Sequence, residues 1–262
     1  MAFRYRYWLL LPVMLFLSPK SEAQENYTDP GSGVKILFPE NTGIFPHQWT
    51  GKKVSPSIQP LPPEESIRLE DLLTFAFSKY PRSVLNANLQ KVYVVKSMTF
   101  YGLRYGGTNY QHTVYLSDDT DNPWFSDDYI EQVFHHEFSS ILLRDFHDYF
   151  DKTKWLALNP PSFRYGKGGA DAIKQGEASM TLDPETIKQG FLSQYSTASV
   201  EEDINVFAQN LFTGDREFWR VFELNEPIRE KTRLLISFYH RINPAFTESY
   251  FRSFTFGTTA QK

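Results

Sequence analysis

The sequence contains no cysteine, and this absence removes several kinds of chemistry at once. Disulfides, thiolate nucleophiles and cysteine-based metal sites are excluded, because each of them needs the Cys sulfur. Lipid attachment of the bacterial lipoprotein kind is excluded for the same reason. Neither sign of charge is in large excess, since the formal net charge of the 262-residue chain is −4. The composition therefore gives no bulk electrostatic reason to expect nucleic acid or an anionic membrane as a partner.

Internal repeats and coiled-coil heptads are absent as well. The one lysine-bearing glycine cluster, Gly166-Lys167-Gly168-Gly169, lacks the frame of a phosphate-binding loop. Aromatic residues are abundant instead, with 23 Phe and 15 Tyr. They favour an aromatic-rich core, with stacking on carbohydrate or peptide as the alternative. The length suits one large domain with a sizeable core, or two small ones.

The N-terminus has the pattern of a secretory signal peptide over residues 1–23. Arg4 and Arg6 give a positive start, and an apolar run of about ten residues from Trp8 to Leu17 follows, too short to span a bilayer. Ser21-Glu22-Ala23 is a small-x-small cleavage site, so the mature chain is expected to begin near Gln24 without a transmembrane helix. A membrane anchor or a core segment is the alternative. Together with the missing cysteine, this pattern predicts export to the periplasm, the outer-membrane surface or the medium.

Residues 24–65 are rich in Pro and Gly and predict an extended N-terminal arm or linker. A single domain is expected over residues 66–262. It begins with a helical pattern from Ile67 to Phe77 that ends at Tyr80-Pro81. Two strand-like runs follow, 91–100 and 110–116. Because Gly102, Gly106 and Gly107 lie between the runs, they predict an antiparallel hairpin with a long loop.

The strongest helical pattern lies at the centre of the chain. Ser126 suits the N-cap, and Asp127 and Asp128 suit the first turn. Apolar residues then recur with a period near 3.6, which predicts an amphipathic helix of about twenty residues. These apolar residues are Ile130, Val133, Phe134, Phe138, Ile141, Leu142 and Phe146.

This helix carries His136-Glu137-Phe138-Ser139-Ser140, which matches a zinc-protease motif except for one metal ligand. In the intact H-E-x-x-H pattern, two His one turn apart bind zinc and the Glu is the general base. Here Ser140 stands where the second His belongs, and a serine hydroxyl is a poor zinc ligand. His136 has an ordinary alternative, a helical His bonded to a carbonyl or carboxylate. Glu137 has one too, a surface Glu.

The C-terminal half predicts further helices after a loop-rich stretch from Asp151 to Gly190. The second helix is expected from Val200 to Phe212, with Thr213-Gly214 closing it. A third is expected from Ile228 to Ile242, stopped by Asn243-Pro244. A last helical turn or two is expected around residues 246–254.

The segment before the second helix contains Gly190-Phe191-Leu192-Ser193-Gln194-Tyr195, and the first turn of the helix contains Glu201-Glu202. With the central motif, this resembles the zinc-binding metallopeptidases of bacterial nutrient-import loci, a family of import-associated zinc metallohydrolases. It is more distantly similar to the catalytic domain of anthrax lethal factor. The spacing of seven residues from Tyr195 to Glu202 is the same as in that family. The resemblance covers residues 112–212, and more loosely the helices that follow.

The resemblance implies a role for each matching residue. His136 and Glu202 would bind zinc, and Glu137 would be the general base. Tyr195 would donate a hydrogen bond to the oxyanion, and the strand at 110–116 would be the edge strand that pairs with an extended substrate. Two positions depart from the family pattern. Ser140 leaves two protein ligands where catalytic zinc normally has three, and Val206 replaces an acidic residue one turn after Glu202.

Glu202 and Tyr195 also have ordinary alternatives. Glu202 suits a first-turn acid stabilised by the helix dipole, and Tyr195 suits a core Tyr with a bonded hydroxyl. With the resemblance, the expected fold is α+β and zincin-like: a small antiparallel sheet on the central helix, then a mainly helical C-terminal half.

Two functions stay open. The first is an exported zinc metallohydrolase acting on a peptide or polymer, with weak zinc binding because of Ser140. The second is a non-catalytic pseudo-enzyme that binds a polymer or a partner, with outer-membrane import machinery as the expected neighbour. A purely structural secreted domain is a third, weaker alternative.

Overall fold

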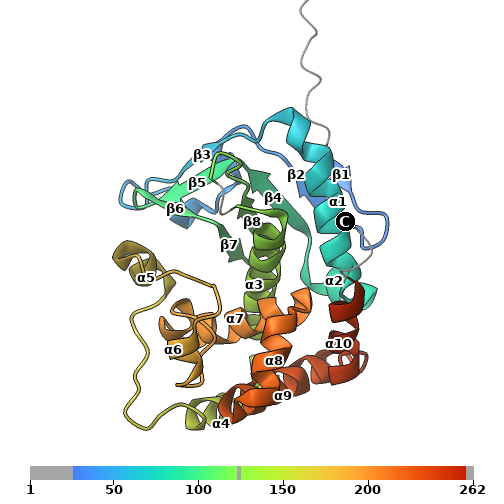
Figure 1. Cartoon of the computed structure of the whole chain (residues 1–262). Coiled ribbons are helices and arrows are strands. Elements are labelled where there is room, and N and C mark those ends of the chain that lie inside the picture. The colour runs from blue at the N-terminus through green and yellow to red at the C-terminus, as the bar shows by residue number, and fades with distance from the viewer. Residues whose placement is uncertain (1–25, 123–124, 258–262) are drawn as a thin grey trace, which may run out of the picture.

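The computed structural model describes residues 26–122 and 125–257. The strands gather in one half of the molecule and the C-terminal helices in the other (Figure 1). The main sheet is five-stranded, in the order β1-β2-β4-β8-β7. Its strands are β1 (Tyr27–Thr28), β2 (Lys35–Leu37), β4 (Lys91–Val95), β7 (Gly107–Tyr110) and β8 (Thr113–Ser117). The predicted signal peptide, residues 1–23, lies outside the described residues.

The pairing of these strands differs from the expected hairpin. β4 and β8 are parallel, with Val92 opposite Val114, and β2 is parallel to β4. Only β1 on β2 and β7 on β8 are antiparallel. The antiparallel prediction was wrong because the run at 91–100 divides at Lys96: β4 joins the main sheet, and the chain crosses a second sheet before it returns through β7 to β8. The sheet on the central helix is therefore mixed.

The second sheet is small and antiparallel, in the order β3-β5-β6. Its strands are β3 (Ser57–Gln59), β5 (Ser97–Phe100) and β6 (Leu103–Tyr105). Tyr101 and Gly102 join β5 to β6, both with positive φ (55° and 74°), as a two-residue hairpin turn requires. Phe45, Phe100 and Tyr115 pack together as a separate aromatic cluster beside this sheet.

The main core lies between the sheet and the helices α1 (Ser66–Ser78) and α3 (Asp127–Asp145), both of which were predicted. The Ser126 side chain accepts from Tyr129 N at 3.2 Å and so caps α3. One face of α3 is buried against β7, β8, α1 and α7. Because α3 is fixed on several sides, it offers a rigid platform for side chains on its remaining face.

The C-terminal half is helical, as expected. α7 (Val200–Thr213) ends at Gly214, whose φ of 69° suits a left-handed cap. α8 (Arg216–Leu224) is followed by α9 (Glu226–Ile242) and α10 (Glu248–Gly257). The predictions for the second and third helices are therefore confirmed by α7 and α9.

The remaining elements are short. They are the α-helices α2 (Arg82–Asn88), α4 (Lys152–Ala157), α5 (Gly169–Gln175) and α6 (Pro184–Ile187). The 3₁₀ helices are η1 (Thr42–Ile44), η2 (His47–Trp49), η3 (Pro63–Glu65), η4 (His147–Tyr149) and η5 (Tyr195–Thr197). Within residues 26–122 and 125–257, no helix is both long enough and apolar enough to cross a bilayer.

Candidate functional site

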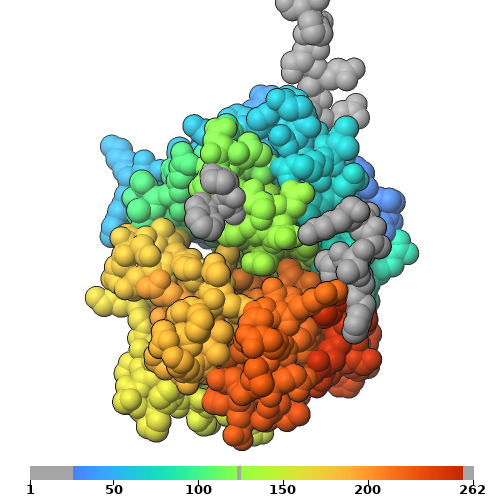
Figure 2. Space-filling view, in the orientation of Figure 1, coloured from blue at the N-terminus to red at the C-terminus, as the bar shows by residue number. Residues whose placement is uncertain are grey.

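A cavity of about 310 Å³ opens between the strands and the helical half. The surface is hollowed between the yellow segment that contains α5 and the green segment of the β-strands and α3 (Figure 2). Five parts of the chain line the cavity: residues 104–109, the face of α3 that carries His136 and Glu137, residues between 169 and 180, Tyr195, and the start of α7. α5 reaches the strand half, where Lys174 Nζ lies 5.6 Å from the centre of the Tyr101 ring.

His136 projects from α3 into this cavity and is nearly buried. Its Nε2 lies 2.9 Å from Glu202 Oε2, and its Nδ1 lies 3.0 Å from Gln209 Oε1. The Ser199 hydroxyl caps α7 by accepting from Glu202 N at 3.1 Å, which fixes the first turn that carries Glu202. Both ring nitrogens of His136 therefore contact side chains of α7.

The His136–Glu202 contact is an ion pair. Burial alone would lower the pKa of His136, but the hydrogen bond and negative charge of Glu202 outweigh burial and raise that pKa to about 9. The imidazole is therefore positively charged at neutral pH. In that state Nε2 carries a proton, and a metal ion that binds at Nε2 must displace this proton.

Glu137 follows His136 on α3 and faces β7. Asn109 Nδ2 donates to Glu137 Oε2 at 2.8 Å, and Arg144 donates to the Asn109 side-chain oxygen at 3.1 Å. Burial raises the pKa of Glu137 to about 7, although the nearby charge of His136 opposes the rise. A carboxyl group with this pKa exchanges protons readily near neutrality.

Tyr195 completes the group of four predicted residues. Its ring stacks on His136 with centroids 5.9 Å apart. Burial, with the negative charge of Glu202, raises the pKa of the Tyr195 hydroxyl well above its usual range, so the group stays protonated. The structure thus brings His136, Glu137, Tyr195 and Glu202 to one cavity, while their chemical roles stay predictions.

Gly169 lies directly against two of these residues. A Cβ atom at this position would lie 2.3 Å from both Glu202 Oε1 and Tyr195 Oη. Only glycine lets the start of α5 come this close to the site. This role has no signature in the sequence, where Gly166-Lys167-Gly168-Gly169 resembles only an incomplete phosphate loop.

Ser140, at the position of the missing His, is also engaged. It is nearly buried, and its hydroxyl donates a hydrogen bond to Glu201 Oε1. Val206, for which the resemblance implied an acidic residue, is fully buried in the core. Gln209 instead supplies the polar contact to His136. Its spacing of about two helical turns from Glu202 was the one sequence signal for this contact.

The donor set does not fit a catalytic zinc ion. Among the described side chains, no group of three or more His, Cys, Asp or Glu is arranged to hold a metal. His136 and Glu202 are two donors, and they bond to each other rather than converge on a vacant point. Catalytic zinc normally has three protein ligands.

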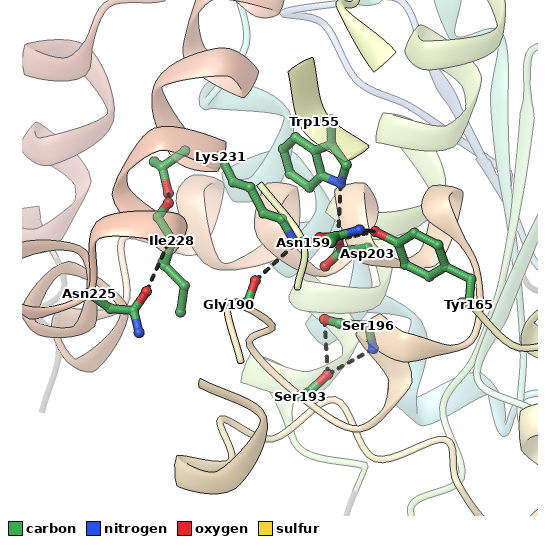
Figure 3. A network of polar contacts seen from close by, with 11 residues as sticks. Trp155, Asn159, Tyr165, Gly190, Ser193, Ser196, Asp203, Asn225, Ile228 and Lys231 are labelled. Atoms are coloured by element: carbon green, nitrogen blue, oxygen red, sulfur yellow. Dashed lines mark hydrogen bonds and ion pairs between the residues drawn. The ribbon is translucent and has the colours of Figure 1, made fainter. Parts of the chain in front are cut away.

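A buried network holds α7 from its other side (Figure 3). Asp203 and Lys231 are fully buried, and Lys231 Nζ lies 2.8 Å from Asp203 Oδ2. The same oxygen accepts from Trp155 Nε1 at 2.9 Å and from Tyr165 Oη at 2.7 Å. Lys231 also donates to the Gly190 carbonyl at 2.9 Å. The network therefore fixes the helix turn that presents Glu202.

The strand that borders the cavity is β7, not the predicted edge strand at 110–116. β8, which contains most of that run, is paired on both sides by β4 and β7. The prediction failed because the short strand Gly107–Tyr110 was taken for part of a loop. Gly107 lies against α3, where a Cβ would meet Val133 Cγ1 at 2.3 Å. The absence of a side chain at Gly107 therefore allows the strand to pack closely against the helix.

Comparison with known proteins gives one distant likeness. No protein-family model matches the chain, and no curated protein matches it. Among solved structures, the fold is similar to the crystal structure of a "putative zinc-binding metallo-peptidase" from Bacteroides caccae, with a TM-score of 0.52 and 16% identity. The match covers 75% of this chain and 77% of the other. The chain thus has an α+β fold, zincin-like by this distant structural match.

Proposed function

We propose that this protein uses a metallopeptidase fold to bind an extended peptide without hydrolysing it. One observation carries the proposal: the polar atoms that would receive a zinc ion are satisfied by other side chains. His136 contacts Glu202 and Gln209, and Ser140 bonds to Glu201. A serine hydroxyl is a poor ligand for zinc, and zinc can bind the imidazole only by displacing a proton and the contact with Glu202.

The peptide would add a strand to β7. No strand of the described chain lies beyond β7 in the main sheet. Gly106 O accepts from Ser117 N at 2.8 Å, and in an antiparallel ladder alternate residues bond to the same neighbour. The backbone groups of Gly107 and Asn109 therefore point away from β8. An extended peptide can pair with these groups along the cavity wall.

A second candidate is an active zinc hydrolase with low metal affinity. Glu137, with a pKa of about 7, and the protonated Tyr195 hydroxyl favour this alternative. They are the general base and the oxyanion donor that such an enzyme needs. The two candidates differ in their metal dependence, which is directly measurable.

The test is zinc affinity, measured by competition with a chromophoric chelator. We expect weak binding by the wild type. Ser140→His should bind zinc at least about tenfold more tightly, because positions 136 and 140 share one helix face. Even residues that only orient metal ligands change metal affinity by that factor. His136→Ala in the Ser140→His background is the control and should lose the gain. The hydrolase would be established instead if the wild type binds one zinc tightly and cleaves peptides, and if His136→Ala loses both properties.

We also propose that the protein is exported and works beside outer-membrane import machinery. The support is the signal-like pattern of residues 1–23 and the family resemblance. After expression in a Gram-negative host, N-terminal sequencing of the periplasmic product should begin near Gln24. A mature protein that still starts at Met1 would contradict the export proposal and leave the binding proposal untouched.

A further inference from the structure

The cavity holds more negative charge than the nearby residues neutralise. Glu137, Glu201 and Glu202 all line it. His136 pairs with Glu202, whereas the polar contacts of Glu137 and Glu201 are the neutral groups of Asn109 and Ser140. In the part of the chain that the structure describes, neither Glu137 nor Glu201 forms an ion pair with Lys, Arg or His. The carboxyl groups of Glu137 and Glu201 are thus both left without a cationic partner among the described residues.

Arg104 also lines the cavity, but it pairs with Asp119 and its side chain is largely exposed. Arg144 is held at the edge of the site by Asn109 and Asp145. Both guanidinium groups are therefore already engaged. Neither removes the excess of carboxylate in the cavity.

An amide oxygen without a partner belongs to a residue of the same cavity wall. Asn205 is on α7 one turn after Glu201, lines the cavity and is only 2% exposed. Its Oδ1 has no hydrogen-bond partner among the described residues. A buried acceptor without a donor is costly, and such an atom in a cavity indicates a missing ligand donor. Asn205 therefore points to a ligand that donates hydrogen bonds.

We propose that this cavity binds the positively charged side chain of a lysine or arginine in a peptide paired with β7. The proposal rests on the function proposed above and names the class of peptide. The charged group neutralises Glu137 and Glu201 and donates to Asn205 Oδ1. Ammonium and guanidinium groups carry several N–H donors and no acceptor, which suits a cavity supplied with free acceptor oxygens.

An organic cation fits better than a metal ion for geometric reasons. A metal needs several donors that converge at about 2.0–2.6 Å, and the described side chains contain no such group. Hydrogen-bonded cations accept separate partners at about 2.7–3.2 Å. The volume of about 310 Å³ lies within the usual range for ligand sites and exceeds what a single ion needs.

The experiment compares four labelled peptides that differ only at one central residue, which is Arg, Lys, Gln or Glu. Binding is measured by fluorescence polarisation with EDTA present. We expect the Arg and Lys peptides to bind roughly tenfold more tightly than the Gln peptide, and the Glu peptide to bind most weakly. Glu201→Gln and Glu137→Gln should each reduce the Arg-to-Gln affinity ratio several-fold. Glu185→Gln, an exposed carboxylate on α6, is the matched control and should leave the ratio unchanged.

The possible failures are distinguishable. If the Gln peptide binds as tightly as the Arg peptide, the charge-specific site is wrong while peptide binding stands. If no peptide binds, the proposed function fails, and calorimetry with N-acetyl-lysine amide and agmatine tests the cation site alone. Binding of either small cation that Glu201→Gln weakens would support the site, and no binding would overturn it. In buffer without EDTA, displacement of the Arg peptide by micromolar calcium or zinc would show a metal site and would also overturn the inference.

Discussion

Two adjacent histidines on α3 occupy opposite electrostatic environments. His136 faces Glu202 and is charged, whereas His135 points into the core and is fully buried. The His135 ring lies between Glu131 Oε1, 3.2 Å from Nε2, and the Tyr80 hydroxyl, 2.8 Å from Nδ1. Burial lowers the pKa of His135 to about 4 even though Glu131 opposes the shift. His135 is therefore neutral at physiological pH.

This burial makes stability sensitive to acid. Below about pH 6.5 the unfolded chain protonates His135 while the folded chain does not, so the free energy of unfolding falls as the pH drops toward 4. The full effect is roughly 3 kcal/mol. Contacts with His135 and Lys79 outweigh burial and lower the pKa of Glu131, so protonation of Glu131 destabilises the fold further at the acid end.

Urea denaturation between pH 7.5 and 4.5 tests this prediction. His135→Gln should be less stable than the wild type at pH 7.5, because it loses ring packing against Phe212. Its stability should also fall less steeply with acid. Equal slopes for the two proteins would mean that His135 titrates normally and is not isolated from water.

At the scale of elements, α7 is held from two sides. Glu202 faces the cavity and α3, while the next residue, Asp203, faces the segment before α7 and the helix α9 (Figure 3). Asp203 Oδ2 accepts three hydrogen bonds, from Trp155, Tyr165 and Lys231. Removal of one member of such a buried pair leaves the other charge unpaired in the interior.

Substitutions at this pair should be strongly non-additive. Asp203→Asn and Lys231→Met should each lower the free energy of unfolding by about 3–5 kcal/mol. The double variant should lose clearly less than the sum, because no unpaired charge remains. Chemical denaturation of the four proteins gives the coupling energy. Additive losses would show that the two groups act independently, and the exposed pair Arg233–Glu230 supplies a control with little coupling.

The helices were predictable because each has a local signature. α3 and α7 combine an apolar period with a Ser N-cap. That His136 and Glu202 would meet was implied only by the family resemblance, because periodicity does not say which helices face each other. The strand partners were not predictable, because alternating residues indicate a strand but neither its neighbour nor its direction. The glycines at 106 and 107 were taken as loop residues, yet they allow Tyr129 and Val133 to approach the backbone of the edge strand.

The part of the site that lies on helices was easier to predict than the part that lies on strands and loops. Motif residues on helices have a fixed spacing, so their faces can be compared. Asn109 comes from an edge strand and Gly169 from the start of a seven-residue helix, and neither belongs to a repeating pattern. Only the folded chain brings these two residues to Glu137 and Glu202.

At the scale of the whole molecule, the cavity lies where two differently built halves meet. The strand half contributes residues 104–109, and the helical half contributes residues 169–180 and the start of α7. α3 belongs to both halves, since it contacts the main sheet and α7. The segment 26–59, expected as an arm or linker, supplies β1 and β2 to the main sheet and β3 to the second sheet.

The order of the strands also determines how the chain must fold. β2 pairs in parallel with β4, and the whole of α1 and α2 lies between them in sequence. β4 pairs in parallel with β8 only after the second sheet has been crossed. Long-range parallel pairing requires the chain to lose the entropy of loop closure before any stabilising contact forms, so such sheets form slowly. The newly made chain should therefore remain without its central sheet for longer than a helical protein of this length. That delay would suit the export proposed above, because a translocation machinery that accepts only unfolded chains would gain time.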